Sequence, residues 1–119
     1  FGVGFYTKYG DGGVDISPIA DLLKTQVYEV AKYLNIIESI QVAQPTDGLW
    51  HDNRTDEQQI GVDYEELEWA MNELVKNPSL KGLTLEQIKT TQIYLNFNRQ
   101  NQHKMNPIPV CEIPIVFLA

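Results

Sequence analysis

The sequence predicts a mostly helical chain with little strand. Apolar residues recur every three to four positions over two segments, at about 22–35 and 63–76, which is the spacing of a helix that buries one face. Capping-box patterns also stand where helices are predicted to begin, at 63 and 84. Strand-like composition is confined to the two ends. A length of 119 residues suits one domain or part of one.

The first segment, residues 1–7, is apolar and aromatic and is interrupted by two glycines. It indicates a short strand or the exit of one, because glycine weakens a strand interior but lets another backbone approach. An opening of this kind, without Met, is typical of the interior of a protein, so we expect the numbering to begin partway through a longer polypeptide. Residues 7–16 follow as a loop that contains three more glycines.

The next predicted element is a helix over about 22–35. Ser17-Pro18 opens this region, with proline in the first turn, where it is tolerated. The helix is expected to end near Asn35. Its apolar face is formed by Leu23, Val27, Val30, Ala31 and Leu34.

Residues 42–62 are polar, contain one proline and two glycines, and show no period. They predict a loop of about 20 residues, a length that is uncommon inside a compact domain and is often a lid or a binding loop.

Two more helices are predicted, at about 63–76 and 84–104. Asp63 with Glu66, and Thr84 with Gln87, have the spacing of capping boxes. Proline residues follow both helices. The tail, residues 105–119, is apolar from 110 with Pro114 in its middle, which indicates an edge strand or a tail packed on another surface.

The net charge of −7 and the isoelectric point of about 4.6 exclude a non-specific nucleic-acid-binding surface. No apolar run approaches the ~20 residues of a membrane span. A single cysteine, Cys111, excludes an intramolecular disulfide, and no Cys/His spacing indicates zinc. The composition fits a cytoplasmic protein that binds neither nucleic acid nor a membrane.

Two groups of charged residues lie near the ends of the chain. In loop 7–16, Lys8 can contact an anion, while Asp11 and Asp15 can accept protons or hold a cation. The alternative for this loop is a surface turn with solvated charges. His103-Lys104, close to Arg99, forms a basic concentration in an acidic chain, or simply favourable charge at a helix C-terminus.

Two further candidates lie between these groups. Lys24 stands in a first helical turn, where a cation is unfavourable for the helix dipole but suits a phosphate site; the alternative is an exposed lysine. Thr46 offers a hydroxyl beside backbone N–H groups that a phosphate could meet, or belongs to an ordinary Pro-Thr-Asp-Gly turn.

Three motifs, taken in order, resemble the C-terminal half of ammonia-dependent NAD⁺ synthetase. FYTKYGDGGVDISPIADLLKTQVYEVAKYL (5–34) resembles the family's substrate loop and next helix. PTDGLW (45–50) with TDEQQIGVDYEEL (55–67) resembles its lid loop and following helix, and QHKMNPIP (102–109) resembles its terminal motif. The resemblance covers about residues 1–109, and three motifs with similar order and spacing are specific.

The resemblance implies an enzyme of the adenine-nucleotide α-hydrolase (PP-loop) group, with a Rossmann-like α/β fold of which this chain is the mostly α portion. It implies a homodimer that binds deamido-NAD⁺ near the dimer interface, with ATP as co-substrate and Mg²⁺ as its metal. ATP adenylates the nicotinate carboxylate and releases diphosphate. Ammonia then displaces AMP, giving NAD⁺.

Matched residue by residue, the resemblance assigns deamido-NAD⁺ contacts to Lys8, Asp15, His103 and Lys104. It assigns ATP contacts to Lys24 and Thr46, with Lys24 also offsetting charge on phosphorus. Asp11 falls where a carboxylate holds ammonium or takes its proton. Loop 42–62 corresponds to a lid that excludes water.

The family's ATP loop, Ser-Gly-Gly-x-Asp-Ser, and its Mg²⁺-holding Glu are expected upstream of Phe1. No metal ligand is therefore expected in this portion, and the isolated chain is expected to be inactive. Two alternatives remain: another amidating or adenylating ligase of the PP-loop group, and a non-catalytic helical interaction module. The substrate motifs at 7–15 and 102–104 argue against the first.

Overall fold

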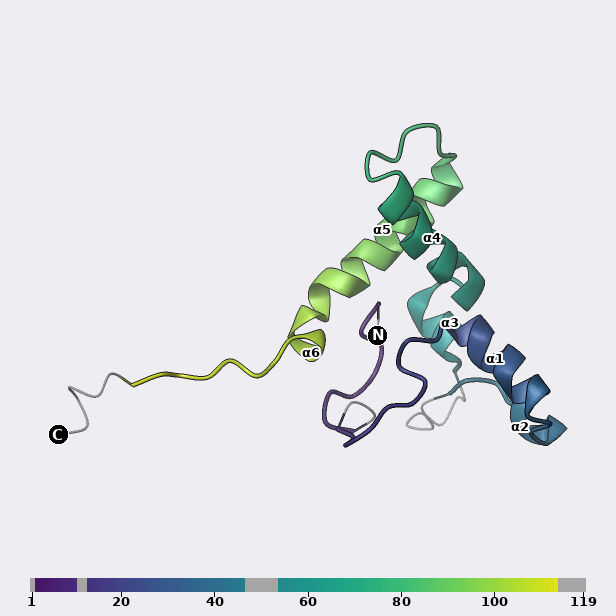
Figure 1. Ribbon diagram of the computed structural model, residues 1–119. Helices are drawn as coiled ribbons and strands as arrows, with labels where there is room; N and C mark the ends of the chain where they lie inside the picture. The colour runs from purple at the N-terminus through teal and green to yellow at the C-terminus, as the bar shows by residue number, and fades with distance from the viewer. Residues whose placement is uncertain (1, 11–12, 47–53, 114–119) are drawn as a thin grey trace.

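The computed structural model describes residues 2–10, 13–46 and 54–113, and these contain six helices and no strand. Figure 1 labels the helices in chain order. They are α1 (Lys24–Tyr33), α2 (Glu38–Gln41), α3 (Asp56–Ile60), α4 (Tyr64–Lys76), α5 (Leu85–Gln100) and α6 (Gln102–Met105). The mostly helical chain predicted from the sequence is confirmed.

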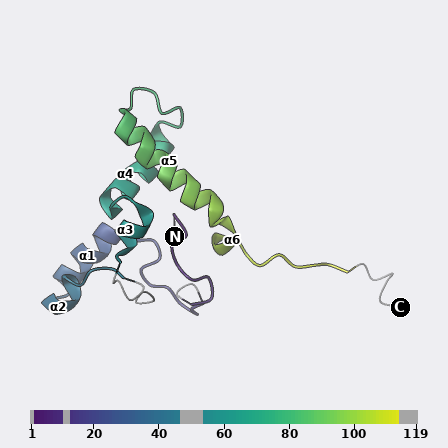
Figure 2. The same ribbon diagram turned by 180° about the vertical axis from the view of Figure 1, so that it is seen from behind.

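The helices form an open V. Figures 1 and 2 show α4 and α5 as its two arms, joined by the loop between them, with α3, α1 and α2 at the foot of the α4 arm and α6 ending the α5 arm. The radius of gyration is 18.3 Å, against about 13–14 Å for a compact domain of this length. This part of the chain therefore encloses little interior of its own.

The few buried side chains lie on α3, α4 and α5, and α4 and α5 cross each other. Ile60, Leu67 and Ala70 are buried apolar side chains, and Thr90 and Thr91 are buried beside them on α5. The Thr91 hydroxyl donates to the Gln87 carbonyl at 2.8 Å, which satisfies it inside its own helix. Small residues at this crossing permit the two helices to approach closely.

Both predicted capping boxes are confirmed. Glu66 N donates to Asp63 Oδ1 at 2.8 Å, and Asp63 N donates to Glu66 Oε2 at 3.1 Å. In the second box, Thr84 N donates to Gln87 Oε1 at 2.9 Å, and Gln87 N donates to Thr84 Oγ1 at 3.2 Å. Each box satisfies backbone donors that a helix N-terminus otherwise leaves unpaired.

The loop predicted over 42–62 was wrong at residues 56–60, which form α3. A third capping box starts this helix: Gln58 N donates to Thr55 Oγ1 at 3.2 Å, and Thr55 N donates to Gln58 Oε1 at 3.0 Å. Gly61 ends it with φ of 91°. Five residues are too few to display a helical period, so only the Thr-x-x-Gln spacing signalled it. Residues 47–53 of the predicted lid lie outside the described residues.

The strand expected at the N-terminus is also absent over residues 2–7. The backbone turns there, with φ of 61° at Gly4 and a hydrogen bond from Tyr6 N to Gly4 O of 3.0 Å. Side chains of α5 and α6 bind this backbone where a strand would have needed a neighbouring strand. An edge strand is likewise absent over 110–113, where Val110 and Ile113 are exposed; residues 114–119 lie outside the described residues.

Two predicted helices differ from the structure in their bounds: one is shorter, and the other is divided in two. Ser17-Pro18 opens a run of turns, with Ala20 N bonded to Ser17 O at 3.2 Å, and α1 begins only at Lys24. The helix predicted over 84–104 is interrupted at Asn101, which is the C-cap of α5. The Asn101 side chain is hydrogen-bonded to the backbone of the N-terminal segment.

Candidate functional site

The N-terminal segment is attached to the end of the α5 arm. Asn98 Nδ2 donates to Gly2 O at 2.8 Å, and Asn101 Nδ2 donates to Val3 O at 2.9 Å. The Phe5 and Phe97 rings meet edge to face, with centroids 6.3 Å apart. We call residues 2–8 together with 97–106 the clasp.

Two of the predicted site lysines close the clasp from opposite sides. Lys104 Nζ donates to Gly4 O at 3.0 Å, and the Tyr6 hydroxyl donates to Lys104 O at 3.0 Å. Lys8 Nζ donates to the backbone carbonyl of His103 and, at 2.8 Å, to that of Asn106. Each ammonium has three N–H donors, so these bonds fix the lysines without neutralising their charge.

Gly4 makes the close approach of the two segments possible. It is buried, and a Cβ built on it would lie 2.3 Å from Asn101 Cβ. Its φ of 61° is in the left-handed region, which favours glycine. The clasp brings Lys8, His103 and Lys104 together from opposite ends of the sequence, with the His103 imidazole exposed.

A second site surrounds Lys24 at the start of α1. Lys24 Nζ lies 5.6 Å from the Tyr28 ring centroid and 5.5 Å from that of Tyr64, within cation–π range. The Tyr64 hydroxyl donates to Asp56 Oδ2 at 2.8 Å. Burial, and then the hydrogen bond to Asp56, raise the pKa of Tyr64 far above its usual range, so the hydroxyl remains a donor. We call Lys24, Tyr28, Tyr64 and Asp56 the lysine–tyrosine cluster.

Neighbouring bonds hold this cluster to the rest of the fold. Thr25 N and Oγ1 donate to the two carboxylate oxygens of Glu68 at 3.0 and 2.6 Å, which joins the first turn of α1 to α4. Asp56 N donates to Pro45 O at 3.0 Å. Thr46, exposed and next in sequence to Pro45, therefore lies on the segment bonded to the cluster.

The structure does not unite all the predicted residues. Asp15 is exposed on its loop and makes no hydrogen bond to another described residue. Asp11 lies outside the described residues. Tyr28, Tyr64 and Asp56 were missed from the sequence. The spacing of Lys24 and Tyr28, one helical turn apart, was a usable signal, whereas nothing local related either residue to Tyr64.

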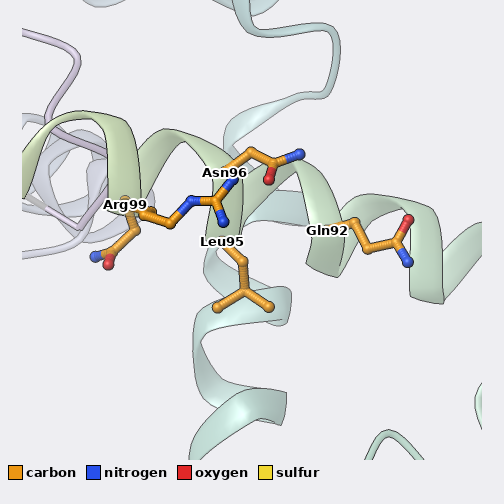
Figure 3. Close-up of a pocket in the computed structure, with 5 residues that line it drawn as sticks. Gln92, Leu95, Asn96 and Arg99 are labelled. Atoms are coloured by element: carbon orange, nitrogen blue, oxygen red, sulfur yellow. The ribbon is translucent and has the colours of Figure 1, made fainter.

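A groove on α5 adjoins the clasp and shares Asn98 and Arg99 with it. It has a volume of about 470 Å³ and is lined by Gln92, Leu95, Asn96, Asn98 and Arg99. Figure 3 shows these side chains lying along the helix, with the Arg99 guanidinium beside Asn96. None of the sequence-predicted site residues lines it.

Among residues 2–10, 13–46 and 54–113, no group of three or more His, Cys, Asp or Glu is gathered closely enough to hold a metal ion. No helix in those ranges is both long enough and apolar enough to cross a bilayer.

The described part of the chain is helical and carries two lysine-centred sites, the clasp and the lysine–tyrosine cluster. Sequence comparison identifies it further. The family model described as NAD synthase matches residues 1–108, and the chain belongs to this family. The Rossmann-like fold expected for the whole enzyme is consistent with that membership.

Its relatives include proteins named NH(3)-dependent NAD(+) synthetase. That of Methanococcoides burtonii is 39% identical over 108 residues, covering 86% of this chain and 40% of the relative. That of Thermoplasma acidophilum is 40% identical over 104 residues, covering 87% and 41%. That of Syntrophomonas wolfei is 50% identical over 66 residues, covering 56% and 26%. The chain spans about two fifths of the length of the first two relatives.

Proposed function

We propose that this chain forms the substrate-binding portion of an ammonia-dependent NAD⁺ synthetase, a carbon–nitrogen ligase of NAD biosynthesis. The nicotinate carboxylate of deamido-NAD⁺ attacks the α-phosphorus of ATP, and diphosphate leaves. Ammonia attacks the resulting acyl adenylate, AMP leaves, and the amide of NAD⁺ remains. The family match and the names of the relatives support this proposal.

The single observation that carries the proposal is the clasp. Residues almost one hundred positions apart meet there, and they include three of the four residues assigned to deamido-NAD⁺: Lys8, His103 and Lys104. Two half-buried ammonium groups beside an exposed imidazole suit an anionic ligand with diphosphate and carboxylate groups. Asp15 is the fourth assigned residue and approaches the ligand from its exposed loop.

The lysine–tyrosine cluster is the proposed ATP contact. The Lys24 ammonium offsets the negative charge that develops on phosphorus during adenylation, and Thr46 contacts the nucleotide from the adjoining segment. Asp11 holds ammonium or accepts its proton before the nitrogen attacks. Mg²⁺ screens the phosphates of ATP when bound, and we assign it no ligand among residues 1–119.

The proposal extends to a cytoplasmic homodimer whose ATP loop and Mg²⁺ ligand come from polypeptide other than these 119 residues. A row of exposed apolar side chains supports further polypeptide on the α1–α2 face: Tyr33, Leu34, Ile37, Ile40 and Val42. The Ser-Gly-Gly-x-Asp-Ser motif does not occur in the sequence, so we expect no turnover from the isolated chain.

The test is NAD⁺ formation by the full parent polypeptide supplied with ATP, Mg²⁺ and deamido-NAD⁺. Ammonium is the expected nitrogen donor, and glutamine is the comparison. NAD⁺ with ammonium supports the proposal. A folded parent that consumes ATP but forms no NAD⁺ activates a different acid, which favours another ligase of the group. A parent on which ATP and deamido-NAD⁺ have no effect favours an interaction module.

A further inference from the structure

The Lys24 ammonium is held by aromatic rings from two different helices. Tyr28 lies one turn further along α1, whereas Tyr64 is the first residue of α4. Both ring centroids lie less than 6 Å from Nζ. Tyr28 moves with Lys24 on the same helix, whereas the Tyr64 ring belongs to α4 and contacts the ammonium from outside α1.

Two hydrogen bonds and partial burial fix the position of Tyr64. Its hydroxyl donates to Asp56 Oδ2 at 2.8 Å, its backbone N donates to Glu57 Oε1 at 3.4 Å, and the residue is half-buried. Asp56 is in turn bonded through its backbone to Pro45. The ring is therefore anchored to the first turn of α3 and to the segment that carries Thr46.

The choice of rings as partners has a chemical consequence. A carboxylate next to Lys24 would neutralise the ammonium, and in the described part of the chain no carboxylate or carbonyl accepts a bond from Nζ. Aromatic faces attract a cation while leaving its full charge and its N–H donors for another ligand. The ammonium also stands at the N-terminus of α1, where the helix dipole favours an anion and not a cation.

We propose that Tyr64 is a positioning residue for Lys24: its ring, anchored by the hydrogen bond to Asp56, holds the ammonium in place for the phosphates of ATP. The inference rests on the proposed function. In this role Tyr64 acts through Lys24. Its removal should therefore affect ATP and leave deamido-NAD⁺, bound at the clasp, unaffected.

The experiment uses the full parent polypeptide and compares Tyr64→Leu, which removes the ring, with Tyr64→Phe, which removes only the hydroxyl. We expect Tyr64→Leu to raise the KM for ATP about fivefold to tenfold and Tyr64→Phe about twofold, with the KM for deamido-NAD⁺ unchanged. Val75→Ala is the control, because Val75 lies on α4 with Tyr64 but is 83% exposed, and it should leave both constants unchanged. Equal rises in both KM values for the Tyr64 variants would overturn the proposal.

A double-mutant cycle with Lys24→Ala separates positioning from a general loss of structure. If Tyr64 acts through Lys24, Tyr64→Leu has no further effect once Lys24 is alanine, whereas additive losses overturn the inference. The same cycle can be measured without turnover, as the affinity of the parent variants for ATP in calorimetry. A parent that makes no NAD⁺ but shows this coupling refutes the proposed function and keeps the role of Tyr64. If Tyr64→Leu does not fold, the cycle with Tyr64→Phe decides.

Discussion

The clasp and the lysine–tyrosine cluster both contain lysines from the family motifs, but they hold them in opposite ways. In the clasp, Lys8 and Lys104 donate to backbone carbonyls of the opposing segment, so the ammonium groups that we propose contact a ligand also join the two ends of the fold. In the cluster, Lys24 contacts only rings among the described residues. Under the proposed function, the clasp lysines therefore combine structure with binding, whereas Lys24 serves its ligand alone.

The largest expected effect is a loss of stability when the clasp is disrupted at a residue that carries no charge. Gly4→Ala places a Cβ 2.3 Å from Asn101 Cβ at a left-handed φ, and we expect the free energy of unfolding of the parent to fall by about 3 kcal/mol. Gly61→Ala is the matched control, since its φ of 91° is also left-handed but no atom lies within 4 Å. It should cost about 1 kcal/mol. Equal losses in urea unfolding would show that the segments do not meet closely at Gly4.

The next effect should separate function from stability at the cluster. Lys24→Ala is expected to lower NAD⁺ turnover by roughly a hundredfold through lost charge stabilisation, while the free energy of unfolding changes by less than about 1 kcal/mol. Lys32→Ala, at the exposed end of the same helix, is the control and should keep full turnover. Near-wild-type turnover in Lys24→Ala would remove this lysine from the reaction.

At the clasp, a lysine substitution should change both substrate binding and the free energy of unfolding. Lys104→Ala removes the donor to Gly4 O, and we expect the KM for deamido-NAD⁺ to rise about tenfold and the free energy of unfolding to fall by about 1 kcal/mol. Lys89→Ala, exposed on α5, should change neither. An unchanged dependence on deamido-NAD⁺ would leave Lys104 with its structural role alone.

The smallest effect concerns the helix that carries Asp56. Thr55→Ala removes the acceptor for Gln58 N and should destabilise α3 by about 1 kcal/mol, seen as faster hydrogen exchange of that amide. Because Asp56 anchors Tyr64, the KM for ATP should rise about twofold while that for deamido-NAD⁺ stays constant. Thr55→Ser retains the cap and should exchange as slowly as the wild type. Faster exchange in the serine variant would contradict capping as the cause.

Local patterns in the sequence predicted the larger helices well. Asp63 with Glu66 and Thr84 with Gln87 act within four residues, so their chemistry is visible in a short window. The same pattern at Thr55 and Gln58 did not predict a helix, because the five residues of α3 are too few to show a helical period of apolar residues. The strand expected over 1–7 failed for a different reason, since nothing in that segment reveals that asparagine side chains of α5 will take its carbonyls.

The candidate site was predictable only in part. Motif resemblance singled out Lys8, Lys24, His103 and Lys104. It did not predict which groups these side chains contact. The approach of the Tyr64 ring to Lys24 depends on how α4 lies against α1, a tertiary relation fixed partly by Glu68 and Thr25. Such pairs, forty residues apart in sequence, leave no local signal.

The clasp also dictates an order of events during folding. The α4–α5 pair joins neighbouring segments through a short loop, whereas the clasp bonds span 95 to 100 positions. Closing so long a loop costs more chain entropy, so we expect the helical pair to form before the clasp. A chain emerging from the ribosome cannot complete the clasp until the residues beyond Asn98 are free to reach back to Gly4.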